Sequence, residues 1–228
     1  VDRSAIIGRK GEPINRNSPI ALISSVILDE HPGSTIVTDS VTSDGLAEYI
    51  SEKGGRHHRF RRGYKNVINE GIRLNEAGEE CWLAIETSGH AALRENHFLD
   101  DGAYLAAKLI VFAAKLYKEG KQVHEVIASL KQPKESKEIR IKLTDPDFKA
   151  QGAKALEDMK AKAGGVEGWT ILEPNYEGLR VSCGNVDEAG WWLLRMSLHD
   201  PVMPLNIESN VEGGVEAIEG KLKSLGLI

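Results

Sequence analysis

Apolar stretches with strand and helix spacing alternate along the first 130 residues. From Ile20 to Leu28 the apolar positions recur with helical spacing, and Ser18-Pro19 before them predicts the start of a helix. His31-Pro32-Gly33 predicts its end. The β-branched run at residues 35–38 predicts a buried strand, because short runs of this kind rarely form helices.

The same reasoning extends to the rest of this region. Residues 4–11, an apolar stretch followed by Gly8-Arg9-Lys10-Gly11, suggest a hairpin. Strands that alternate with helices across short turns indicate a layered α/β domain with a mostly parallel sheet. The remaining expected elements are helices at 45–53, 66–76 and 100–118 and strands at 56–60 and 82–86.

The pattern changes after Leu130. Residues 131–136 are polar and contain Pro133, so they are the best candidate for a linker. Beyond them the spacing predicts a smaller α+β domain with helices on one face of an antiparallel sheet. Its expected elements are a strand at 137–143, a helix at 148–163, three or four strands between 169 and 208, and a helix at 211–225.

Composition narrows the possible functions. The chain is 41% hydrophobic and 28% charged, with a formal net charge of −5, which argues against nucleic acid as a partner. No apolar run reaches the roughly 18–20 residues that span a bilayer, so we expect no membrane partner. Cys81 and Cys183 are too far apart for a disulfide framework or a CxxC metal site. These observations favour the cytoplasm or another reducing compartment such as a plastid.

The first residues also carry information. Val1-Asp2-Arg3-Ser4 contains no initiator methionine and no signal-peptide pattern. We therefore expect the sequence to be cut from a longer protein, so any targeting signal would lie upstream. Asp2 alone cannot hold a divalent ion, because Mg²⁺ requires near-octahedral oxygen coordination. Further ligands would have to come from outside this segment.

Residues 86–90, Glu-Thr-Ser-Gly-His, follow a predicted strand, where ligands gather in α/β sheets. Glu86 and Ser88 are two residues apart and can face the same ligand if the backbone is extended. A carboxylate and a hydroxyl suit the vicinal hydroxyls of a sugar, and His90 is a candidate for proton transfer. The alternative is a polar turn in which Glu86 and Ser88 cap a later helix.

Residues 56–65 concentrate four arginines, one lysine and two histidines in an acidic protein. Guanidinium groups match phosphate oxygens, so a phosphorylated small molecule is one interpretation. A solvated edge strand protected by its charges is another, and RNA binding is a third. The sequence alone leaves all three open.

A third candidate site is Arg195-Met196-Ser197-Leu198-His199-Asp200-Pro201, after an apolar run. An arginine at a strand end, a hydroxyl and free backbone N–H groups can form an anion nest. A strand that simply runs into an Asp-Pro turn is the alternative.

The order of these segments along the chain is specific. Residues 85–90, followed by Asp100-Asp101-Gly102, resemble the GE-x-SGH…DDG sugar loop of the α-D-phosphohexomutases, the phosphoglucomutase/phosphomannomutase family. Gly63-Tyr64-Lys65 resembles the G-[FWY]-K turn of that family. Residues 1–3 resemble the end of its metal loop, D-x-D-x-D-R, and residues 195–201 resemble its phosphate loop, R-x-SNTEP. Gly178-Leu179-Arg180-Val181 resembles the strand before that loop.

The resemblance covers essentially the whole chain and corresponds to the C-terminal half of the family. It implies that residues 1–131 are the third domain, with the tail of the metal loop and of the second domain at their start. Residues 136–228 would be the phosphate-binding fourth domain. The implied reaction interconverts hexose 1-phosphate and hexose 6-phosphate, of glucose or mannose, through a bisphosphorylated sugar.

Roles follow position by position from the same resemblance. Glu86 and Ser88 would bind sugar hydroxyls, and Lys65 and His90 would transfer protons or contact the reacting phosphoryl group. The non-reacting phosphate would be held by Arg195, Ser197 and neighbouring groups, which include His199 and Arg180. Asp2 would be the last of three Mg²⁺ ligands, and Arg3 would support the phosphoserine.

The chain departs from the family pattern at three places, one of which is Arg61-Arg62 before Gly63, more basic than the Pro-Thr or Lys-Thr common in the family. Its phosphate loop reads Ser197-Leu198-His199-Asp200 where Ser-Asn-Thr-Glu is usual, and the phosphoserine motif T-A-S-H-N-P is absent. The resemblance therefore implies a piece that binds hexose phosphate but needs the missing N-terminal domains, and their Mg²⁺, for mutase activity. A non-catalytic sugar-phosphate-binding module is the alternative function.

Overall fold

The structure is a computed structural model, which describes residues 2–8, 11, 14, 16–197 and 200–228. The chain forms two compact units, Val1–Lys131 and Gln132–Ile228. Each unit has its own sheet and its own hydrophobic core.

The first unit contains a four-stranded sheet in the order β2-β1-β3-β4. Its first three strands are parallel, and β4 runs antiparallel to β3. The strands are β1 (Thr35–Asp39), β2 (Arg56–Phe60), β3 (Cys81–Ile85) and β4 (Ala91–Leu93). The helices are α1 (Asn17–Glu30), α2 (Asp44–Glu52), α3 (Tyr64–Glu76), α4 (Gly102–Lys118) and α5 (Val123–Val126), with a 3₁₀ turn at Arg94–Asn96.

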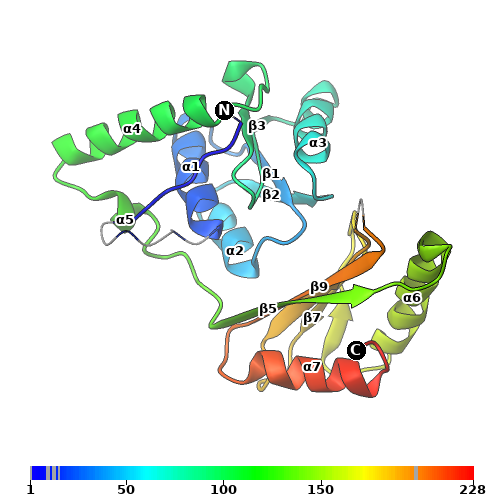
Figure 1. Ribbon diagram of the computed structural model, residues 1–228. Helices are drawn as coiled ribbons and strands as arrows, with labels where there is room; N and C mark the ends of the chain where they lie inside the picture. The colour runs from blue at the N-terminus through cyan, green and yellow to red at the C-terminus, as the bar shows by residue number, and fades with distance from the viewer. Residues whose placement is uncertain (1, 9–10, 12–13, 15, 198–199) are drawn as a thin grey trace. The chain divides into compact units, whose positions relative to one another are not determined.

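Strands β1, β3 and β4 of this sheet are mostly buried on both faces, whereas the edge strand β2 is exposed or half-buried along its length. Ile36 and Leu83 pack with α1, α2 and Leu105 of α4, whereas Val37 and Ala84 pack on the other face with α3. Figure 1 shows α3 on the opposite side of the sheet from α1 and α2. This three-layer arrangement confirms the expected α/β domain.

Some element boundaries differ from the prediction. Helix α1 begins at Asn17, so Ser18 and Pro19 lie inside its first turn, where a proline is tolerated because the first N–H groups have no helical partner. Helix α3 begins at Tyr64, two residues before the predicted start. The expected hairpin near the N-terminus includes Arg9 and Lys10, which lie outside the described residues.

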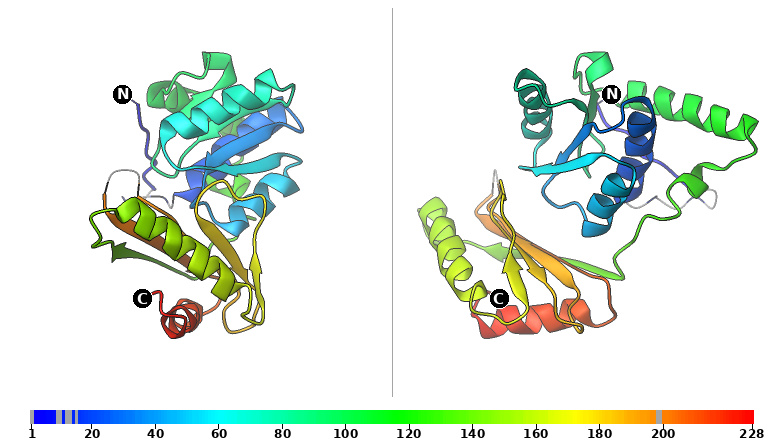
Figure 2. Two further views of the ribbon diagram at one scale, coloured as in Figure 1. Left: turned by 90° about the vertical axis from the view of Figure 1, so that its right-hand side faces the viewer. Right: turned by 180° about the vertical axis from the view of Figure 1, so that it is seen from behind.

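The second unit contains an antiparallel sheet in the order β5-β9-β8-β7-β6. The apolar residues of alternate strand positions pack with both helices in one core, so one face of the sheet is covered (Figure 2). This confirms the expected α+β class. The elements are β5 (Glu135–Lys142), α6 (Phe148–Ala163), β6 (Trp169–Ile171), β7 (Leu179–Cys183), β8 (Gly190–Leu194), β9 (Val202–Ser209) and α7 (Gly214–Ser224).

Each unit contains one buried free cysteine, Cys81 in the first and Cys183 in the second. Burial raises the pKa of the Cys81 thiol to about 12 and also raises that of Cys183, so neither is a ready nucleophile. Within the described ranges, no helix is both long enough and apolar enough to cross a membrane.

Candidate functional site

Residues 86–90 form the turn of the hairpin that joins β3 to β4, which we call the 86–90 turn. The Glu86 N–H donates to the His90 carbonyl (2.9 Å), and the Gly89 N–H donates to the Glu86 carbonyl (3.0 Å). Gly89 has a φ of +94°, and a Cβ there would lie 2.5 Å from the Ser4 carbonyl oxygen. The turn therefore requires glycine at this position both for backbone conformation and for space.

The side chains of Glu86 and Ser88 lie against each other. The Ser88 hydroxyl donates to Glu86 Oε2 (2.9 Å), and the backbone N–H of Gly63 donates to Glu86 Oε1 (2.6 Å). Glu86 is only 5% exposed. A carboxylate oxygen accepts more than one hydrogen bond, so this pair can still receive the hydroxyls of a ligand. The alternative prediction, that Glu86 and Ser88 cap a later helix, is wrong, because Asp101 caps the following helix α4.

Thr87, between these two residues, is bound to Asp39 at the end of β1. Its N–H donates to Asp39 Oδ1 (3.2 Å) and its hydroxyl donates to Asp39 Oδ2 (2.6 Å). Burial raises the pKa of Asp39 to about 6 although the Thr87 hydroxyl lowers it, and the charge of Glu86 adds to the rise. We did not predict Asp39 from the sequence; its position as an acidic residue ending a buried strand was the available signal.

His90 is held by two neighbours. Its Nδ1 lies 2.6 Å from Asp100 Oδ2, and its ring stacks on Tyr64 with 4.7 Å between the ring centroids. Because a carboxylate only accepts, Nδ1 carries a hydrogen. Among the described residues nothing bonds to His90 Nε2, which is thus available to a ligand.

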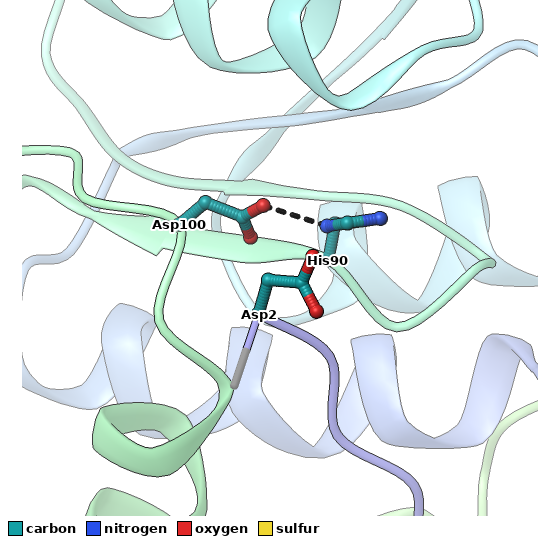
Figure 3. Close-up of side chains that lie close together, drawn as sticks. All are labelled: Asp2, His90 and Asp100. Carbon is teal, nitrogen blue, oxygen red and sulfur yellow. Dashed lines mark hydrogen bonds and ion pairs between the residues drawn. The ribbon is translucent and has the colours of Figure 1, made fainter.

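Asp2 lies close to this pair, as Figure 3 shows. Ligand atoms of Asp2, His90 and Asp100 are all within 4.8 Å of one another. The set does not fit Mg²⁺, which requires about six oxygens, because it contains two carboxylates and an imidazole nitrogen that already binds Asp100. Asp2 could contribute one ligand of a larger site.

Arg3 pairs through its backbone with His90, and the adjacent Ser4 N–H donates to the Gly89 carbonyl (3.1 Å). The backbone of Arg3 also packs on Gly102, where a Cβ would lie 2.6 Å from the Arg3 carbonyl carbon. The N-terminal segment therefore lies against the 86–90 turn.

Most of the basic side chains on β2 bond within the unit. β2 is an edge strand, as one interpretation expected, but its charged side chains contact neighbouring elements rather than only solvent. These bonds run from Arg56 to Thr35, from His57 to Thr38, from His58 to Glu70, and from Arg59 to Asp44.

Lys65, at the start of α3, differs from these side chains. In the described part of the chain no carboxylate pairs with it, and its Nζ lies 5.9 Å from the centroid of the Tyr64 ring. Because Tyr64 stacks on His90, Lys65 belongs to the same end of the sheet as the 86–90 turn. Lys65, Glu86, Ser88 and His90 are thus gathered in the first unit.

In the second unit, Arg195 and Ser197 lie in the connection from β8 to β9. The Arg195 N–H donates to the Pro204 carbonyl (3.1 Å), the Ser197 N–H donates to the Val202 carbonyl (3.0 Å), and Ser197 Oγ accepts from the Asp200 N–H (3.3 Å). His199 and Leu198 lie outside the described residues. The connection presents an arginine and a hydroxyl, two parts of the expected anion site, whereas the backbone N–H groups of Arg195, Ser197 and Asp200 already donate within the unit.

Arg180 lies near this connection. It pairs with Leu193 across β7 and β8, and because side chains alternate along a strand, Leu193 and Arg195 share its face of the sheet. Its guanidinium lies 3.6 Å from the centroid of the Trp191 ring, a cation–π contact. Met196 points the other way, toward Gly152 of α6.

Comparison with known proteins gives consistent matches. A sequence model described as "Phosphoglucomutase/phosphomannomutase, alpha/beta/alpha domain III" matches residues 15–133. A phosphoglucomutase of Neisseria gonorrhoeae is 27% identical over 228 residues, covering 98% of this chain and 45% of that protein. A phosphomannomutase/phosphoglucomutase of Pseudomonas syringae pv. tomato is 30% identical over 220 residues, covering 96% and 43%.

Among solved structures, a phosphoglucomutase/phosphomannomutase family protein from Burkholderia thailandensis superimposes with a TM-score of 0.76 at 24% identity. The match covers 98% of this chain and 44% of that one, and it establishes the shared fold. The chain therefore spans less than half the length of each of these three proteins.

Proposed function

The chain belongs to the phosphoglucomutase/phosphomannomutase family, and we propose that it supplies the sugar-binding and phosphate-binding half of a hexose-phosphate mutase. The single observation that carries this proposal is the bonded pair of Glu86 and Ser88 at the end of β3, fixed from the other side by Gly63. An acceptor and a hydroxyl held side by side suit two neighbouring hydroxyls of glucose or mannose.

Each site residue has a role in this proposal. Glu86 and Ser88 hold the hexose, while Arg195 and Ser197, with support from Arg180 and from the segment of His199, hold the non-reacting phosphate. His90 donates a proton to, or accepts one from, the reacting end of the substrate through Nε2, and Lys65 provides positive charge at the same end. Phosphoryl transfer depends mainly on positioning and on charge stabilisation, which this set would provide.

The whole reaction requires more than these 228 residues. We expect no turnover by this chain alone, because the family's phosphoserine motif does not occur in it. The Mg²⁺ that the family resemblance implies would need ligands in addition to Asp2, so no step here is assigned to it. Arg3, beside the 86–90 turn, would support a phosphoserine provided by other domains.

The test is an NMR titration of this chain with glucose 1-phosphate, mannose 1-phosphate and inorganic phosphate, following amides near Ser88 and Ser197. The proposal expects saturable shifts at both places with the sugar phosphates, and shifts near Ser197 alone with phosphate. Equal shifts near Ser197 for all three ligands would leave only an anion site, and no shift at millimolar ligand would contradict the proposal.

The alternative of a non-catalytic sugar-phosphate module predicts the same binding. The two functions predict different results when a longer protein that contains this chain is assayed for turnover. Binding of hexose phosphate without interconversion would favour the non-catalytic module. The non-catalytic alternative rests on the altered sequence of residues 197–200, which departs from the family's phosphate loop.

A further inference from the structure

Asp39 occupies the centre of the edge where the parallel strands end. It is the last residue of β1, which lies between β2 and β3, and it is fully buried. The 86–90 turn follows β3, and Arg62-Gly63 follows β2. Asp39 is therefore placed to contact the segments that leave both neighbouring strands.

The contacts form a closed ring of five residues. Asp39 accepts from the N–H and the hydroxyl of Thr87, at 3.2 and 2.6 Å. Thr87 lies between Glu86 and Ser88, the two residues proposed to bind the sugar. Glu86 accepts from the Gly63 N–H at 2.6 Å, and Arg62 Nε lies 3.9 Å from Asp39 Oδ2. The ring thus runs from Asp39 through Thr87, Glu86, Gly63 and Arg62 back to Asp39.

We propose that Asp39 is a positioning residue that sets hexose discrimination by holding the 86–90 turn through Thr87, an inference that rests on the proposed function. The Ser88 hydroxyl bonds to the Glu86 carboxylate, whereas the Thr87 hydroxyl bonds to buried Asp39. Thr87 therefore anchors the turn on one side while its two neighbours present polar groups together. Fixing Thr87 fixes the direction of both.

Burial makes this anchor rigid and also indicates that it serves more than stability. The buried Asp39 carboxylate depends on protein partners rather than water for its hydrogen bonds, and Thr87 supplies two of them, so removing Asp39 would remove both acceptors of Thr87. A buried carboxylate disfavours folding relative to an apolar side chain of similar size, so its presence at the edge of a binding site favours a functional reason.

The first experiment measures amide hydrogen exchange without ligand in Asp39→Ala, Asp39→Asn and Thr87→Val. We expect the Thr87 amide of the parent chain to be protected from hydrogen exchange, and Asp39→Ala to reduce that protection at least about tenfold. Asp39→Asn keeps an oxygen that can accept the Thr87 N–H, so it should largely preserve protection. Unchanged exchange in Asp39→Ala would overturn the proposal.

The second experiment measures affinity for glucose 1-phosphate, mannose 1-phosphate and inorganic phosphate in the same variants. We expect Asp39→Ala to reduce the affinity ratio between the two sugars to near one, with inorganic phosphate binding unchanged. Thr87→Val, which removes only the hydroxyl, should reduce the ratio in the same direction. A parent-like ratio in both variants would overturn the proposal.

The two experiments separate this inference from the proposed function. If the parent chain binds none of the sugar phosphates, the proposed function fails, and hexose discrimination by Asp39 fails with it. The amide-exchange data then still decide whether Asp39 holds the turn. If the parent discriminates and Asp39→Ala discriminates equally, only the positioning role is wrong. Should Asp39→Ala not fold, Thr87→Val decides the same question.

Discussion

The Asp100 carboxylate lies 2.6 Å from His90 Nδ1 and thereby selects the hydrogen position on the imidazole. A neutral His90 keeps its hydrogen on Nδ1 and leaves Nε2 as the acceptor. The other carboxylate oxygen of Asp100 is buried and has no hydrogen-bond partner among the described residues, so the hydrogen bond to His90 is the one described for this carboxylate's side chain.

Replacing Asp100 should therefore change the tautomer of His90. In Asp100→Ala the hydrogen is expected to move largely to Nε2, the tautomer that an unperturbed histidine side chain favours, since no other described residue accepts from Nδ1. The ¹⁵N shifts of the imidazole report the two tautomers directly. Asp100→Asn retains a carbonyl oxygen and should keep the parent tautomer; an unchanged tautomer in Asp100→Ala would show that Asp100 does not control His90.

Removing the Glu86 carboxylate should weaken sugar recognition. In Glu86→Ala the hydroxyls of a bound hexose and the Gly63 N–H lose their acceptor, a loss on the order of 1–3 kcal/mol. Calorimetry with glucose 1-phosphate and mannose 1-phosphate would measure it. Inorganic phosphate serves as the control, and a variant that binds every hexose phosphate as the parent does would refute the assignment of Glu86.

Arg195→Ala should weaken phosphate binding roughly ten- to hundredfold, because it removes a charge-assisted donor from a nearly buried position. Arg140→Ala is the matched control: it is an arginine of the same unit, 68% exposed and paired with Glu138. Its phosphate affinity should stay at the parent value. Equal affinity losses in both variants would indicate a general effect of charge rather than a phosphate site at Arg195.

Hydrophobic spacing predicted most of the fold. The bounds of β2 and α6 match the prediction, and both domain classes are confirmed. Strand β4 and helix α5 were missed because three and four residues are too few to show a period. The order of the motifs pointed to the family, and the family match confirms it.

The partners of the site residues were harder to predict. Thr87 and Asp39 are 48 residues apart and meet only because β1 and β3 are adjacent in the sheet. The local sequence did not distinguish among the interpretations of the β2 arginines, because their partners belong to other segments, such as Thr35 for Arg56 and Asp44 for Arg59. Propensity and spacing identify residue types near a strand end, whereas tertiary packing decides what they bind.

Gly89→Ala should destabilise the chain more than Gly78→Ala. Both glycines have positive φ, +94° and +83°, so each substitution has a backbone cost of about 1–2 kcal/mol. Only Gly89 faces another atom, the Ser4 carbonyl oxygen, whereas a Cβ at Gly78 meets nothing within 4 Å. Urea unfolding measures the loss of unfolding free energy in each variant, and the difference between the two losses gives the cost of the contact with Ser4. Equal losses of unfolding free energy would mean that the segment at Ser4 moves away freely.

The buried Asp39 should make folding stability depend on pH in an unusual direction. Its pKa is about 6 in the folded chain against an ordinary value of 3.8, so between these values the folded state holds a proton that the unfolded state has lost. Stability therefore falls as pH rises through this window, and the cost is complete above about pH 6. From pH 4.5 to 7.5 the expected loss is about 1–2 kcal/mol.

Asp39→Asn removes this titration while keeping the size of the side chain. We expect the unfolding free energy of the parent, relative to Asp39→Asn, to decrease by that amount between pH 4.5 and 7.5 in urea titrations. Asp101→Asn is the control: backbone hydrogen bonds, chiefly from Tyr104, lower the pKa of this helix cap, so its contribution to stability is lost only at more acidic pH. The difference in unfolding free energy between Asp101→Asn and the parent should stay nearly constant from pH 4.5 to 7.5. Parallel curves for the parent and Asp39→Asn would mean that Asp39 stays ionised throughout, despite its burial.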